Sequence, residues 1–123
     1  MFRTGLVSVS FRDKTLPEII KAAAGVGLSC IEWGSDVHAP FSDTKKLAEI
    51  KKECGANGIA CCSYGTYYRI GQNTDSELMP YIEAAKILGT DVLRLWCGTK
   101  GAAEYTQAEK KELYEQCVRH AET

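Results

Sequence analysis

Short apolar blocks recur along the chain at a regular interval. They read "GLVSVSF" at 5–11, "LSCIEWG" at 28–34, "IACCSYG" at 59–65 and "TDVLRLWCG" at 90–98. Nearly continuous apolar runs of this length are typical of strands that are covered on both faces. Gly27, Gly58 and Gly89 precede the last three runs at equal spacing. A fixed period of about 30 residues indicates a repeated strand–helix unit.

The segments between these runs carry apolar residues at helical spacing. They predict one helix from Thr15 to about residue 26, and others over 43–55, 75–88 and 107–121. Three of these helices begin with a T-x-x-E capping box, at Thr15, Thr74 and Thr106. Glycines stop the first three helices, whereas no stop signal follows the last one.

The order of elements is therefore strand then helix, repeated four times, which indicates a parallel sheet with helical crossovers. Two folds contain this pattern: a doubly wound sheet, and a (β/α)8 TIM barrel, which needs about 250 residues. Four units in 123 residues make half of such a barrel. Because the chain also stops inside its last helix, we expect an α/β fold in which residues 1–123 form the truncated N-terminal half of a TIM-barrel domain.

Composition places the chain among small soluble proteins. It has 45% apolar residues, 25% charged residues and a net charge of −1. No apolar run approaches the roughly 18 residues of a membrane span, and no signal peptide precedes the first strand. A net charge near zero argues against a protein that relies on contacts with nucleic-acid phosphates. We therefore expect a cytoplasmic protein with no nucleic-acid partner and no membrane partner.

The chain has six cysteines, which is many for its length, but they show no C-x-x-C spacing. A zinc-finger-type site is therefore not indicated, and we expect reduced thiols that serve mostly as small apolar core residues. Cys97 would be a nucleophile only with a base beside it. No G-x-G-x-x-G, P-loop or G-x-S-x-G motif is present, so dinucleotide, nucleotide and serine-hydrolase functions have no support.

Functional side chains are expected where the strands end, because both candidate folds bind ligands at the carboxyl ends of parallel strands. Those ends carry aromatic, acidic and basic residues, and the candidate substrate-binding set is Glu32, Trp33, His38, Tyr64, Tyr67, Arg94 and Trp96. Glu32 and Arg94 lie on alternate strands, which share an interior layer of a barrel, so we expect the two charges to pair. Such a pair is either a structural closure of the barrel mouth or the polar floor of a pocket that orients a hydroxylated substrate.

The aromatic side chains and the histidine have more than one interpretation. Trp33, Trp96 and the tyrosines of "SYGTYYRIG" at 63–71 suit contact with sugar rings, and equally the packing of loops over the barrel mouth. His38 is a surface or supporting imidazole, a contact for a substrate hydroxyl or, less favoured, a metal ligand. The residues alone leave these alternatives open.

Three blocks of the sequence resemble a known group of proteins. "GLSCIEWGSDVHAP", "SYGTYYRIG" and "DVLRLWCG" are similar to the N-terminal half of the xylose isomerase-like TIM-barrel superfamily, and in particular to its sugar phosphate isomerase/epimerase group. The resemblance covers the whole chain. It implies that the ligand is a small sugar or sugar phosphate, and that none of the residues present is catalytic. The pocket residues that it implies are Glu32, His38, Tyr64, Tyr67, Arg94 and Trp96.

The resemblance further implies a divalent metal (Mn, Mg, Zn or Co) held by carboxylates and a histidine of strands five to eight. The metal and a pair of glutamates would support proton transfer beside a carbonyl. All of these ligands would lie beyond Thr123. We therefore expect this chain alone to bind no metal and to be inactive, and we assign isomerase or epimerase activity only to a full-length protein.

The same superfamily contains apurinic-site endonucleases of DNA repair, which place zinc-binding histidines at the ends of strands three and four. The corresponding ends here read "SYG" and "LWCG", without histidine, and "HAP" at 38–40 follows the second strand instead. This function is therefore less favoured.

Two further alternatives need no catalysis. One is a non-catalytic half-barrel fragment, in which two copies would pair as a homodimer through their exposed strand edges. The other is a sugar-binding module that uses its aromatic residues without turnover.

Overall fold

The computed structural model describes residues 2–123 as a four-stranded sheet with four helices. The strands are β1 (Gly5–Val7), β2 (Cys30–Gly34), β3 (Ala60–Ile70) and β4 (Leu93–Cys97). The helices are α1 (Leu16–Gly25), α2 (Thr44–Ala56), α3 (Met79–Leu88) and α4 (Gln107–Ala121). Three short 3-10 turns complete the elements: η1 (Ser8–Phe11), η2 (Asp75–Leu78) and η3 (Ala102–Glu104).

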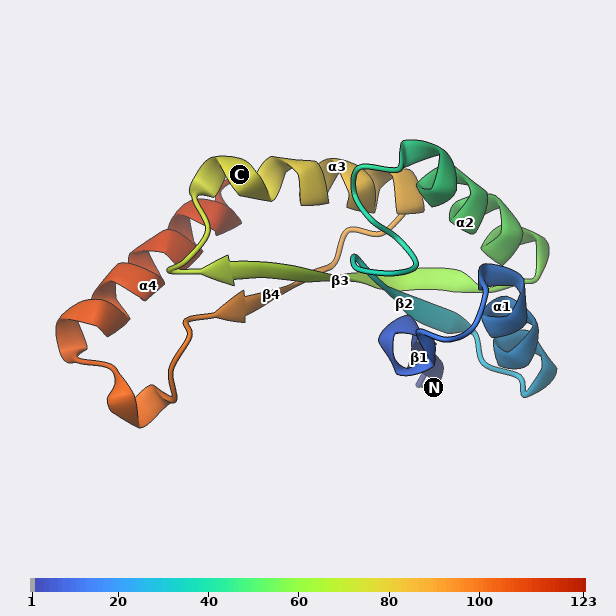
Figure 1. The fold of residues 1–123 in the computed structure, drawn as a ribbon, viewed down its shortest axis with the longest axis horizontal. Helices are drawn as coiled ribbons and strands as arrows, with labels where there is room; N and C mark the ends of the chain where they lie inside the picture. The colour runs from blue at the N-terminus through green and yellow to red at the C-terminus, as the bar shows by residue number, and fades with distance from the viewer. Residues whose placement is uncertain (1) are drawn as a thin grey trace.

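The sheet has the strand order β1-β2-β3-β4, and every neighbouring pair is parallel. The helices gather on one side of this curved sheet (Figure 1). We call the other side the open face. Sequential parallel strands with every helix on one side are the arrangement of one half of a (β/α)8 barrel, whose inner surface would be the open face. The predicted half-barrel fold is therefore confirmed.

The hydrophobic core lies between the sheet and its helices. From α2 it takes Leu47 and Ile50, and from the strands it takes Ile31, Trp33 and Tyr64, all of them fully buried. A second, smaller cluster around Tyr68, Ile70 and Leu78 is completed by partly buried residues of α3, β4 and α4. Helix packing therefore covers one face of the sheet and leaves the other to polar side chains.

Two predicted strand ends were wrong, and β2 and β4 begin two and three residues later than their predicted runs. The first strand was expected over 5–11, but it ends at Val7 and the chain continues in η1. The third was expected to end at Gly65, but β3 continues to Ile70 because its last residues still pair with β4, Arg69 opposite Trp96 and Ile70 opposite Cys97. Tyr67 and Arg69 therefore belong to a strand rather than to a loop.

The helix predictions hold within one residue except at one end. Helix α4 spans 107–121 as predicted, and its capping box is formed, with the side chain of Thr106 accepting a hydrogen bond from the backbone N–H of Glu109. The capping box at Thr74 begins the 3-10 turn η2 instead of an α-helix, and α3 starts only at Met79. Within residues 2–123, no helix is both long and apolar enough to cross a membrane.

The cysteines divide between core and surface. Cys30 and Cys54 are buried, Cys61 and Cys117 are half-buried, and all of them are free thiols. Burial raises the pKa of Cys54 to about 11 and that of Cys61 to about 12, so neither is a thiolate at neutral pH. Cys62 and Cys97 are exposed, so the prediction of mostly buried cysteines holds only in part.

Candidate functional site

Polar and aromatic side chains gather toward the carboxyl ends of β2, β3 and β4 and in the loops that follow β1 and β2. We call this set the open-face cluster. Its members are Arg12, Glu32, Asp36, Ser63, Gly65, Tyr67, Arg69, Arg94 and Trp96. Parallel strands bring these residues together from four separate parts of the chain.

An ion pair between Glu32 and Arg94 crosses β3. Glu32 lies on β2 and Arg94 on β4, and their Oε1 and Nε atoms are 3.0 Å apart. The pair passes over Gly65 of the intervening strand, where an added Cβ would lie 2.7 Å from Nη2 of Arg94 and 2.8 Å from Oε1 of Glu32. The hydroxyl of Ser63 donates to Oε2 of Glu32 at 2.6 Å. The predicted pairing of the two charges is thus confirmed, and Gly65 provides the space for it.

The side chain of Trp96 hydrogen-bonds to β3 where the register between β3 and β4 is irregular. The register shifts between Gly65 and Arg69, which leaves backbone groups of β3 without ladder partners. The indole N–H of Trp96 donates to the carbonyl of Thr66 at 3.1 Å, and the hydroxyl of Thr66 donates to the carbonyl of Arg94 at 2.8 Å. The indole is therefore held in place by the strand distortion, with 42% of its residue surface exposed.

Two guanidinium groups lie against the same indole. The Cζ atom of Arg69 is 5.3 Å from the centroid of the Trp96 ring, and that of Arg94 is 5.5 Å away. These distances are within the range of cation–π contacts. The open face thus combines a flat aromatic surface with two cations beside it.

A second ion pair borders the cluster at the ends of β1 and β2. The guanidinium of Arg12 donates to Oδ2 of Asp36 at 2.6 Å and also to the hydroxyl of Tyr67, which in turn donates to Oδ2 of Asp36. Burial pushes the pKa of Asp36 upward, but hydrogen bonds from Arg12 and from the backbone of Val37 outweigh it, so the pKa lies below its ordinary value. Asp36 is therefore ionised at neutral pH and does not supply a proton.

Arg12 and Asp36 were not among the predicted binding residues, although both follow strand ends. Asp36 comes two residues after β2. Their place in the site could have been predicted, because a carboxylate and an arginine that follow neighbouring parallel strands lie at the same edge of the sheet.

Trp33, His38 and Tyr64 do not lie with the open-face cluster. Trp33 and Tyr64 are fully buried on the helix side, because each is adjacent in sequence to a residue that faces the open side. The hydroxyl of Tyr64 donates to the carbonyl of Ala39 at 2.6 Å, and burial raises its pKa. In this structure these three side chains pack the core, whereas Glu32, Tyr67, Arg94 and Trp96 of the predicted set lie together.

His38 is 2% exposed, and its contacts are structural. Its Nε2 atom is 2.9 Å from the carbonyl of Lys14, so Nε2 carries the proton and donates. The ring also meets Trp33 edge-on, with centroids 6.0 Å apart. These contacts tie the loop after β2 to the loop before α1.

The residues present do not fit a divalent metal. Among residues 2–123, no group of three or more histidine, cysteine, aspartate or glutamate side chains lies close enough together to hold one. The carboxylate of Glu32 is also engaged through both oxygens, by Arg94 and Ser63. What the open-face cluster offers is hydrogen bonding and aromatic contact, which suits the orientation of a hydroxylated ligand.

The comparisons with known proteins give information about the fold alone. No protein-family model matches the chain, and no curated protein matches it. Among solved structures, the chain is similar to the probable 3-DHS dehydratase AsbF involved in petrobactin synthesis from Bacillus anthracis, with 19% identity and a TM-score of 0.73. It is also similar to a protein from Parabacteroides distasonis, with 14% identity and a TM-score of 0.64.

Both likenesses cover 98% of this chain, but only 49% and 50% of the solved chains. The chain therefore spans about half the length of the solved proteins that it resembles. Those proteins are TIM barrels, and the fold of this chain is half of one.

Proposed function

We propose that this chain is the N-terminal half of a TIM-barrel protein of the xylose isomerase-like superfamily that acts on a small sugar or sugar phosphate. The likeness to half of AsbF supports the fold, and the strand-end sequence blocks support the superfamily. The observation that carries the proposal is the Glu32–Arg94 pair over Gly65, which places a fixed carboxylate and guanidinium on the face where barrels bind substrate.

In this proposal the chain binds and orients the substrate. Glu32 accepts hydrogen bonds from substrate hydroxyls through the lone pairs that Arg94 and Ser63 leave free. The remaining N–H groups of Arg94 donate to substrate oxygens, and Trp96 lies against the sugar ring. Proton transfer beside the carbonyl, and the divalent metal that assists it, belong to the other half of the barrel. We therefore expect this chain alone to show no isomerase or epimerase activity.

The two tryptophans provide the test. Each gives one indole N–H signal in a 15N-correlated NMR spectrum, and only Trp96 is on the open face while Trp33 is buried. Addition of xylose or glucose is expected to shift the Trp96 signal in a saturable manner and to leave that of Trp33 in place. Glu32→Gln, which removes the negative charge of the pair, should weaken this binding. Saturable shifts at Trp33, or none at Trp96, would contradict the proposal.

Turnover is tested separately. The chain is incubated with aldoses and their phosphates in the presence of Mn²⁺, Mg²⁺, Zn²⁺ or Co²⁺, and the products are separated. We expect no conversion, and metal-dependent isomerisation by the chain alone would overturn the division of roles.

A sugar-binding module is the second candidate, and the exposure of Trp96 and Tyr67 on the open face favours it. Aromatic side chains of this kind bind sugar rings without further chemistry. Sugar binding with no conversion, even when strands five to eight of such a barrel are supplied as a second chain, would favour this alternative.

A further inference from the structure

The charges of the open-face cluster do not balance. Arg12 pairs with Asp36, and Arg94 pairs with Glu32. Arg69 lies on the same face and takes part in none of the ion pairs formed among residues 2–123. The cluster therefore carries one guanidinium whose charge no carboxylate of this part of the chain offsets.

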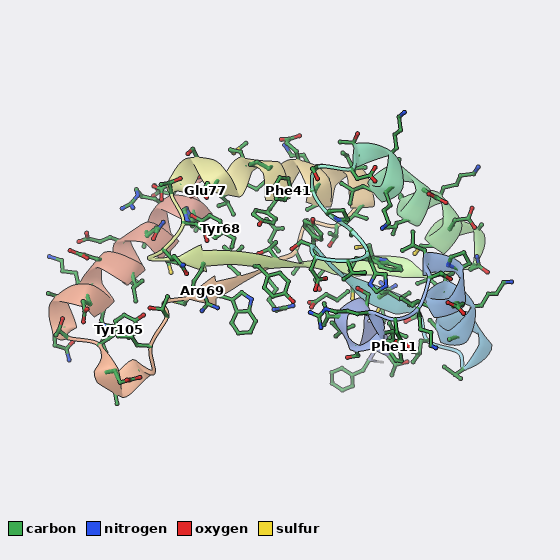
Figure 2. The ribbon with its side chains drawn as sticks, in the orientation of Figure 1. Phe11, Phe41, Tyr68, Arg69, Glu77 and Tyr105 are labelled. Carbon is green, nitrogen blue, oxygen red and sulfur yellow. The ribbon has the colours of Figure 1, made fainter. Side chains whose placement is uncertain are left out.

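Arg69 is also held in a fixed position. Its backbone N–H donates to the side chain of Asn73 at 2.8 Å, and its carbonyl accepts from the backbone of Asn73 at 2.9 Å. One guanidinium nitrogen, Nη1, donates to the carbonyl of Gly98 at 2.6 Å. Figure 2 shows Arg69 on the open side of β3, opposite its neighbour Tyr68, which points toward the helices.

This geometry leaves part of the guanidinium without a partner. Nε and Nη2 of Arg69 donate to no acceptor within residues 2–123, and the Trp96 ring lies against the group at 5.3 Å. Arg69 is a half-buried residue, and a guanidinium that is partly removed from water without a counter-charge is unfavourable. Its planar fork of N–H donors matches the oxygens of phosphate or carboxylate.

We propose that Arg69 and Trp96 form an oxyanion subsite, which binds the phosphate or carboxylate group of a substrate whose hydroxyls meet Glu32 and Arg94. The proposal rests on the proposed function, because it narrows the sugar-like substrate to an anionic one. The ring of Trp96 lies beside the Arg69 guanidinium, and the second cation, Arg94, lies 5.5 Å from the same ring. Arg69 thereby acts as a specificity-determining residue.

The test uses four probes of graded chemistry: glucose, glucose 6-phosphate, glucuronate and inorganic phosphate. Their dissociation constants are measured from the Trp96 indole signal for the wild-type chain, for Arg69→Gln and for Arg3→Gln. Arg3 is a matched control, because it loses the same charge at the opposite, amino-terminal end of the sheet. The same spectra show that each variant is folded.

We expect at least one of the two anionic sugars to bind about tenfold more tightly than glucose, as one charge-assisted contact would give. Arg69→Gln should abolish this preference and Arg3→Gln should retain it. Preference for glucose 6-phosphate or for glucuronate identifies the group as phosphate or carboxylate.

Equal affinities for charged and neutral sugars would overturn the oxyanion subsite while the proposed function stood. An equal loss in Arg69→Gln and Arg3→Gln would also overturn it, since the effect would then be a general one of net charge. If inorganic phosphate bound through Arg69 but no sugar bound, the subsite would stand and the proposed function would fail. Absence of binding by all four probes would overturn both.

Discussion

At the scale of single residues, the site depends on a glycine, Gly65, because this residue has no side chain. Gly65 lies on β3 between the strands that carry Glu32 and Arg94, and any Cβ there would overlap the ion pair. It has no positive φ, so its backbone would accept alanine without strain. The glycine is needed for the close approach of two side chains rather than for a turn.

Gly65→Ala is therefore expected to displace the Glu32–Arg94 pair at little cost to the fold. The atoms that the methyl group would meet are the ends of flexible side chains, so the free energy of unfolding should change by no more than about 1 kcal/mol. The Nε–H signal of Arg94 should shift, and sugar binding should weaken. Gly25→Ala is the control, because its Cβ would meet no atom within 4 Å. An unshifted Arg94 signal in Gly65→Ala would contradict this account.

Tyr64 and Tyr67 make a second comparison at this scale. The hydroxyl of Tyr64 is buried and bonded to Ala39, so Tyr64→Phe leaves a buried carbonyl unpaired and should lower the free energy of unfolding by about 1–3 kcal/mol. Ligand affinity should not change. Tyr67→Phe should instead weaken ligand binding and leave the free energy of unfolding nearly unchanged, because the Tyr67 hydroxyl contacts Arg12 and Asp36 on the open face. Urea unfolding and NMR titration measure the two effects, and a loss of affinity in Tyr64→Phe would restore that residue to the binding set.

At the scale of elements, capping boxes follow local chemistry and strand ends do not. The capping boxes at Thr15, Thr74 and Thr106 form as their spacing predicts. By contrast, β3 runs past Gly65 because β4 is there to pair with it. A capping box involves residues of one turn, whereas the length of a strand depends on a partner far along the chain.

The carboxylate of Glu109, which caps α4, gives a pH-dependent prediction. The ammonium group of Lys100 at 2.8 Å, together with hydrogen bonds from Thr106, lowers its pKa from 4.5 to about 2. Because the pKa in the folded state is depressed, the stabilisation is present above pH 4.5 and is lost as the pH falls toward 2. Over that range the amides in the first turn of α4 should lose protection, measured as their exchange rate relative to that of an unstructured peptide at the same pH.

An NMR titration of the Glu109 carboxyl carbon checks this directly. In Lys100→Gln its pKa should move back toward 4.5, because the largest cause of the shift is removed. A pKa near 4.5 in the wild-type chain would show that the ion pair does not form in solution.

At the scale of the whole molecule, no helix covers the open face of the sheet within residues 2–123 (Figure 1). Within the same residues, the edge strands β1 and β4 each pair with one neighbour only. The exposed edges of this parallel sheet, together with an open face that carries both polar and aromatic side chains, favour association with another half-barrel. For the chain by itself, without strands five to eight, we propose that a second copy takes their place, with β1 of each chain pairing with β4 of the other around a two-fold axis.

Light scattering at micromolar concentration should then give the mass of a dimer, approximately twice 13.5 kDa. Val7→Lys places a charge on the edge strand β1 and should shift the equilibrium toward the monomer, whereas Val26→Lys, at the exposed end of α1, should not. A monomeric mass for the wild-type chain at every concentration would exclude this pairing.

The sequence by itself determined the order of elements, the half-barrel fold and the meeting of Glu32 with Arg94. It could do so because periodicity, capping boxes and the alternation of strand residues are local or repeat along the chain. The same alternation that places Glu32 on the open face puts its neighbour Trp33 on the helix side, and likewise Tyr64. The extension of β3 to Ile70 and the burial of His38 were decided only by the tertiary structure, because they depend on the pairing of β3 with β4 and on how the loop after β2 packs. The role of Gly65 and the unbalanced charge of Arg69 likewise emerge only when strands distant in sequence lie side by side.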